Sequence, residues 1–140
     1  MILALTPEAL IQERVAAFMC HDFRAIFHSY HPDAPFLHFF PDCEAYLAYA
    51  AAEIADTFQI TACQILRTCQ QGETAEVLFR QHLIHKGEDI DSLEIARCHC
   101  DEHGKWFFVA GLRLDALKLP PDLLCCSWDE LLAAGNDLWI

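Results

Sequence analysis

The chain is short of basic residues, of glycine and of long apolar runs. Nine lysines and arginines stand against 21 aspartates and glutamates, so the formal net charge is −12. A surface of this sign repels phosphate backbones and anionic lipids, so we expect neither a nucleic-acid nor a membrane partner. Only five glycines occur and 54% of the 140 residues are hydrophobic, which excludes a disordered chain or a flexible tail.

We also expect no secretory leader at the N-terminus. Residues 1–5 form a short apolar run with no basic region before it, and Thr6-Pro7 breaks it. No apolar stretch approaches the ~20 residues that a membrane helix needs. We therefore expect a cytoplasmic protein whose eight cysteines stay reduced and do not form a disulfide framework.

Reduced cysteines raise the question of a metal site. The nearest candidate ligands are Cys98, Cys100 and His103, because zinc sites use cysteine and histidine at short spacing. Residues 98 and 100 of a strand would share one face, but further ligands would have to converge on them. The alternative is that these cysteines fill a core as small apolar residues. We expect no cofactor.

The first half of the chain has helical periodicity. Thr6-Pro7 is an N-cap with proline at the first helical position, and apolar residues then recur at helical spacing. A second helix is predicted over residues 22–29 and a third over residues 42–55. Residues 32–41 hold three prolines among large apolar side chains, which predicts a packed loop between these two helices.

The period changes to two after residue 56, which predicts strands. They are expected over residues 58–67, 74–83, 92–100 and 106–109. In the first strand, alternation is expected to put Phe58, Ile60, Ala62 and Leu66 on one face. Short turns join the strands, so they form an antiparallel meander. Helices followed by such a sheet indicate an α+β fold with two layers.

The C-terminal end has a different character. Pro120-Pro121 breaks the chain, and Ser127 to Glu130 forms a capping box ahead of an apolar helical segment. Gly135 is predicted to end that helix in a left-handed conformation. A tail this apolar covers either the core of its own domain or the surface of a partner. We favour self-covering, because the capping box indicates a defined helix.

Several motifs together resemble one family. They are Thr6 to Leu10 with Arg14 and Phe18, then Tyr30-His31-Pro32, Leu93 to Arg97, and Glu102 to Gly111. In these patches, over about residues 6–113, the chain is similar to the middle domain of YchJ-like proteins. The resemblance implies a nuclear transport factor 2-like cone, in which N-terminal helices close over a curved antiparallel sheet and leave a pocket. We expect one domain over residues 1–140, with a core of about 6–114 and an extra C-terminal helical segment of about 115–140.

This chain departs from the family in its zinc motifs. Full-length YchJ-like proteins often carry flanking SEC-C motifs, and neither is complete here, since Cys125-Cys126 has no upstream partner pair. With ten phenylalanines and many leucines in a short chain, we expect the cone to be largely filled.

The candidate ligand face lies on the predicted strands. Arg80 and His82 share one face, as do Arg97 and His99, and neighbouring strands would gather them around a small anion. The alternative is an ordinary solvated face, on which arginine pairs with Glu76 or Glu94. A further candidate is the end of the second helix, where Tyr30 and His31 could line the mouth of a cone.

No catalytic motif is present in the sequence, neither a Ser-His-Asp order nor a phosphate-binding loop. We therefore expect a binding or interaction domain without catalysis. The alternative is a pocket enzyme of the isomerase, dehydratase or hydrolase type that acts on a small anionic molecule. The expected partners are a second copy of the chain, paired through the sheet, and a small-molecule ligand or another protein.

Overall fold

The structure is a computed structural model that describes residues 2–136 and 139. Its N-terminal helices are α1 (Pro7–Met19), α2 (Phe23–His28), α3 (Phe36–Phe39) and α4 (Cys43–Glu53). Its strands are β1 (Phe58–Gln71), β2 (Thr74–His85), β3 (Glu88–Cys100) and β4 (Trp106–Arg113). Among the described residues, no helix is both long and apolar enough to cross a membrane.

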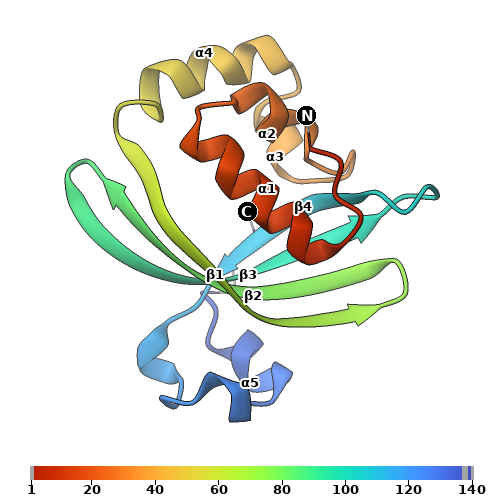
Figure 1. The fold of residues 1–140 in the computed structure, drawn as a ribbon, viewed down its shortest axis with the longest axis vertical. Helices are drawn as coiled ribbons and strands as arrows, with labels where there is room; N and C mark the ends of the chain where they lie inside the picture. The colour runs from red at the N-terminus through yellow and green to blue at the C-terminus, as the bar shows by residue number, and fades with distance from the viewer. Residues whose placement is uncertain (1, 137–138, 140) are drawn as a thin grey trace.

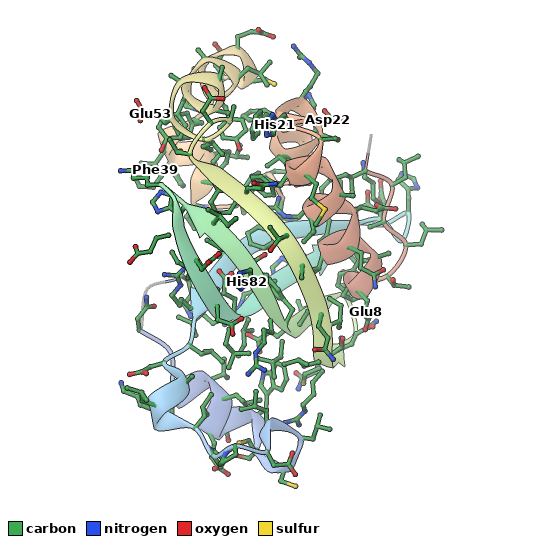
Figure 2. All side chains as sticks on the ribbon, turned by 60° about the vertical axis from the view of Figure 1, so that its left-hand side comes forward. Glu8, His21, Asp22, Phe39, Glu53 and His82 are labelled. Atoms are coloured by element: carbon green, nitrogen blue, oxygen red, sulfur yellow. The ribbon has the colours of Figure 1, made fainter. Side chains whose placement is uncertain are left out.

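The four strands form one antiparallel sheet in the order β1-β2-β3-β4, which confirms the predicted meander. The helices lie on one side of this bent sheet and the C-terminal segment lies on the other (Figures 1 and 2). The α+β prediction is therefore confirmed. We call the helix side the inner face of the sheet and the opposite side its outer face.

Side-chain caps set the helix starts. The Thr6 hydroxyl accepts a hydrogen bond from the Ala9 amide at 3.1 Å, and Asp22 and Asp42 cap α2 and α4 in the same way. The predicted loop over residues 32–41 differs from the structure, because it contains α3. Proline at position 35 is compatible with this short helix because it stands at the N-cap, where no intrahelical N–H is required.

The alternation predicted for the first strand is wrong beyond Ile60. Register shifts occur between Ile60 and Ala62 and again between Ile65 and Arg67. A bulge adds one residue and reverses the facing of those that follow. As a result Ala62 is exposed, whereas Cys63 and Ile65 pack into the core beneath the helices. Bulges also bend a strand, in keeping with the strong curvature of β1 (Figure 1).

Each face of the sheet has its own core. The inner core joins the helices to β2, β3 and β4 through residues that include Leu10, Ile26, Val77, Cys98 and Phe108. The outer core joins the sheet to the C-terminal segment through Leu78, Leu93, Ile95, Leu112, Leu114, Cys126 and Leu131. The tail therefore covers the chain's own sheet, as favoured above. A dimer that used this face would have to form around that segment.

The C-terminal segment consists of η1 (Ala116–Lys118), η2 (Leu123–Cys125) and α5 (Trp128–Ala133). The capping box of α5 is present, with the Ser127 side chain bonded to the Glu130 amide and the Glu130 side chain bonded back to Ser127. The prediction for Gly135 is wrong, since its φ is not positive. Gly135 is instead bridged to Leu114, and a Cβ there would lie 2.8 Å from Leu112 Cγ, so close packing is what favours glycine.

Candidate functional site

A cavity of about 420 Å³ lies between α1 and the inner face of the sheet. Its lining residues are Ile11, Arg14, Phe18, Tyr30, Phe58, Ile60, Phe79, Gln81, Glu94, Phe108, Gly111, Arg113 and Asn136. A wider hollow of about 640 Å³ lies beside the turn from α4 to β1, but most of its polar side chains are exposed. The first cavity is the candidate site, because the buried Arg14 and the partly buried Gln81 and Glu94 converge in it.

The expectation of a largely filled cone is wrong. Many of the aromatic rings pack among themselves under α2, α3 and α4, where Phe36 lies within 5.0 Å of Tyr46 and 4.0 Å of Tyr30, measured between ring centroids. Space is left open beside β4, where Gly111 lines the cavity and has no side chain to fill it. Phenylalanine content alone could not reveal that the rings concentrate at one end.

Arg14 is the central cation of the cavity. Its side chain comes from α1 and is buried, with only 8% of the residue exposed. The guanidinium donates hydrogen bonds to the Ser29 hydroxyl and, at 3.4 Å, to the Tyr30 hydroxyl. Its central carbon lies 4.0 Å from the centroid of the Phe108 ring and 4.8 Å from that of Tyr30. All these partners are neutral, and no carboxylate of the described residues lies within 4.0 Å of Arg14.

Glu94 is the carboxylate of the cavity, on β3. Its Oε2 accepts a hydrogen bond from Gln81 Nε2 at 2.6 Å and another from Ser92 Oγ at 3.2 Å. Burial raises the pKa of Glu94, while Arg113, the two hydrogen bonds and Arg14 act in the opposite direction. Arg113 stands opposite Glu94 in the pairing of β3 with β4, and its carbonyl accepts a 3.3 Å hydrogen bond from the Asn136 amide.

Tyr30 and His31 diverge at the end of α2. Tyr30 lines the cavity, and its ring stacks on Phe36. His31 lies at the edge of the sheet, where its amide donates to the Phe108 carbonyl at 2.8 Å and its ring is 5.1 Å from that of His99. Of the six candidate side chains, Tyr30 alone contributes to the lining of the cavity.

The antiparallel register does not bring Arg80, His82, Arg97 and His99 together. Arg80 stands opposite Leu93, whereas Arg97 stands opposite Glu76, which lies four residues before Arg80 on β2. Arg97 Nη2 forms an ion pair with Glu76 Oε2 at 3.0 Å. His82 lies 3.3 Å from Asp89, well away from α4 and the labelled Glu53 (Figure 2). Burial lowers the pKa of His99, and the neighbouring His31 and Arg97 lower it further.

The three candidate metal ligands differ in how deeply they are buried. Cys98 is fully buried in the inner core, and burial raises the pKa of its thiol to about 12. Cys100 is partly buried, while His103 is exposed in the turn before β4 and lies 3.4 Å from Glu102. Within the described residues, no group of three or more histidine, cysteine or acidic side chains is arranged to hold a metal ion.

Sequence reasoning missed Arg14, Gln81, Glu94 and Arg113. A usable signal existed for the first two. Arg14 falls among the apolar positions of α1, next to Val15 and one turn from Leu10, which are both buried. Gln81 falls in the inward alternation of β2. A polar residue at a position that periodicity assigns to the core marks a buried polar site.

Comparison with known proteins places this chain in a family. The family model for the YchJ middle domain, described as NTF2-like, matches residues 6–111. The chain therefore belongs to the YchJ middle-domain family, as the motifs above indicated. No curated protein matches the chain.

A solved structure shares the fold. It is the solution structure of a SEC-C motif-containing protein from Rhodopseudomonas palustris, with a TM-score of 0.62 and 21% identity. The match covers 79% of this chain and 80% of that one. At this identity the likeness concerns the fold alone.

Proposed function

We propose that this domain binds a small molecule with an acid group in the cavity between α1 and the sheet, and that Arg14 receives that group. The observation that carries the proposal is the setting of Arg14, a buried guanidinium that lines an open cavity and has neutral partners among the described residues. A buried charge is costly unless a counter-charge pairs with it, and Glu94, whose pKa burial raises and Arg14 acts to lower, forms no ion pair with Arg14. A ligand carboxylate fits the arginine fork and would supply that pair.

The cavity is suited to a small ligand in other respects. Its volume lies in the usual range for small-molecule sites, and its walls are mainly aromatic and aliphatic. Few polar groups interrupt these walls, which is the pattern of a site that orients a ligand. A cytoplasmic location is part of the proposal, and it is supported by buried free thiols such as Cys98 and Cys126.

The test compares aromatic acids with their neutral amides. Benzoate, cinnamate and 2-naphthoate would be titrated against benzamide, cinnamamide and 2-naphthamide, with binding followed by amide chemical shifts in NMR. We expect at least one acid to bind more tightly than its amide. In the Arg14→Met variant its affinity should fall roughly tenfold or more, since a charged hydrogen-bond partner is lost.

The matched control is Arg67→Met on the outer face, which should leave the affinity of the folded protein unchanged. Arg67 does not line the cavity, and it bonds instead to carbonyls of the C-terminal segment. The proposal is wrong if no acid binds more tightly than its amide, or if binding survives Arg14→Met.

An enzyme that acts on such an acid is the second candidate, and Glu94 favours it. Burial raises the pKa of this carboxyl group, which suits a group that exchanges protons with a substrate. The lining contains no histidine among the described residues. Incubation with phenylpyruvate in deuterium oxide separates the two functions. Catalysed exchange at its methylene group that disappears in Glu94→Gln indicates the enzyme, and exchange at the uncatalysed rate indicates a binding domain.

A further inference from the structure

The polar groups of the cavity lie at two ends of one path along β3 and β4. The pairing runs from Cys98 opposite Phe108, through Ala96 opposite Gly111, to Glu94 opposite Arg113. Arg14 rests on the ring of Phe108 and therefore marks the first end. Glu94 is four residues along β3 from Cys98, a separation of roughly 13 Å along an extended strand. The cavity thus has an end at Arg14 and an end at Glu94, and the two are close enough for the charge of Arg14 to offset part of the rise that burial causes in the pKa of Glu94.

A glycine forms the floor between these two ends. Gly111 lines the cavity and has no side chain, so the sheet surface is lowest there. Glycine within a strand commonly marks a place where a ligand approaches the backbone closely. The walls above this floor include the rings of Phe18, Phe58 and Phe79. A flat ring fits between such walls, because aromatic groups stack or meet edge to face.

The charges of the lining indicate how many acid groups the ligand carries. Among the described lining residues, Arg14 is a buried cation, Arg113 is an exposed cation that stands opposite Glu94, and Glu94 is the one acid. Arg113 offsets the charge of Glu94, so the charge of Arg14 is left for a single acid group to balance. A second acid group would be placed near Glu94 and repelled by it.

The hydrogen bonds of Glu94 leave one oxygen available to a ligand. Gln81 and Ser92 both donate to Oε2, and Oε1 accepts neither of these bonds. Glu94 is held in place by these two donors, so its second oxygen has a defined position. A carboxylate oxygen of this kind accepts a hydrogen bond from a hydroxyl or amino group.

We propose that the ligand is an aromatic monoacid with a hydroxyl or amino group at the end opposite its acid, the acid held by Arg14 and the donor by Glu94 Oε1. This inference rests on the proposed function, because it assumes that the acid end binds at Arg14. It adds the chemical class of the ligand and its direction in the cavity.

Cinnamates substituted at the para position test the glutamate end. The probes are 4-hydroxycinnamate and 4-aminocinnamate, which carry a donor, and 4-fluorocinnamate, which is of similar size and carries none. We expect the two donor probes to bind roughly tenfold more tightly than the fluoro probe, since a charge-assisted hydrogen bond separates them.

Glu94→Gln is the informative variant. The glutamine oxygen can still accept from Gln81 and Ser92, which leaves its NH₂ group in the place of Oε1. The cavity then presents a donor where it had an acceptor, so the preference for the donor probes should disappear or reverse. If this variant fails to fold, the comparison of probes on the wild-type protein still decides the matter.

Two results would overturn the inference. One is equal affinity of the donor and fluoro probes for the wild-type protein, and the other is a donor preference that persists in Glu94→Gln. Either result would leave the proposed function standing if all three acids still lose affinity in Arg14→Met. If the acids instead keep their affinity in Arg14→Met, both the proposed function and this inference are wrong.

Discussion

Arginines on the outer and inner faces of the sheet have different interaction partners. On the outer face, Arg67 donates to the carbonyls of Leu123 and Cys126 at 3.2 and 2.7 Å, and Arg97 pairs with Glu76. Glu76 also accepts a hydrogen bond from the Trp128 indole at 3.0 Å, and Arg97 lies against the Trp139 ring. On the inner face, Arg14 has hydroxyls and aromatic rings around it, and an open cavity beside it.

This difference separates structural cations from a cation available to a ligand. Arg67 and Arg97 on the outer face help to hold the C-terminal segment against the sheet. Their N–H groups donate hydrogen bonds to acceptors of the chain. Arg14 is more buried and yet has no carboxylate of the described residues in contact. Proteins retain unfavourable buried charges mainly where function requires them. The comparison therefore predicts that outer-face changes affect stability and inner-face changes affect binding.

The largest expected effect on stability comes from Leu131→Ala in α5. Leu131 is fully buried in the outer core, so the substitution leaves a cavity beneath the C-terminal segment. We expect the free energy of unfolding to fall by roughly 2–5 kcal/mol. Urea denaturation followed by circular dichroism measures this loss. Affinity of the folded variant for an aromatic acid should stay at the wild-type value, and a tenfold loss would show that the two faces are not independent.

The next effect contrasts Arg67→Met with Arg14→Met. Arg67→Met removes charged donors from two carbonyls, and we expect it to cost about 1–3 kcal/mol of unfolding free energy. Arg14→Met should cost much less, or even stabilise the chain, because methionine packs well against Phe108 and Tyr30. Ser29 keeps its 2.6 Å hydrogen bond to the Ile26 carbonyl after the change.

Parallel urea titrations of the two arginine variants decide this contrast. A loss for Arg14→Met that equals or exceeds the loss for Arg67→Met would make Arg14 a structural cation. The distinction between the faces would then be wrong, even if Arg14 also contacts a ligand.

Most of the fold could be predicted from the sequence because its signals are local. The Thr6-Pro7 cap, the turns at Gly72, Gly87 and Gly104, and the capping box at Ser127 each involve neighbouring residues. The bulges of β1 could not be predicted in this way. They depend on how β1 pairs with β2 along its whole length, and no residue type within β1 marks their positions.

The candidate site was harder to predict, because it depends on register. Arg80 and Arg97 have the correct period for a shared face, but the pairing of β2 with β3 sets them four residues apart along β2. Glu94 and Arg113 meet only because β3 and β4 align at that point. The alternative reading of the outer face, with Arg97 paired to Glu76, is the arrangement that the structure has.

The smallest expected effect is a pH dependence that Glu94→Gln removes. Burial raises the pKa of Glu94 in the folded chain above its unfolded value, so the folded state binds this proton more tightly. This contribution to stability is fully present below the unfolded pKa and is lost as the pH rises through the folded pKa. Glutamine cannot lose a proton and shows no such loss. The unfolding free energy of the variant minus that of the wild type should therefore increase from about pH 4 to about pH 7, measured by urea denaturation at each pH. A difference that stays constant or decreases over this range would mean that the neighbouring arginines outweigh burial, and that Glu94 belongs with the compensated charges of the outer face.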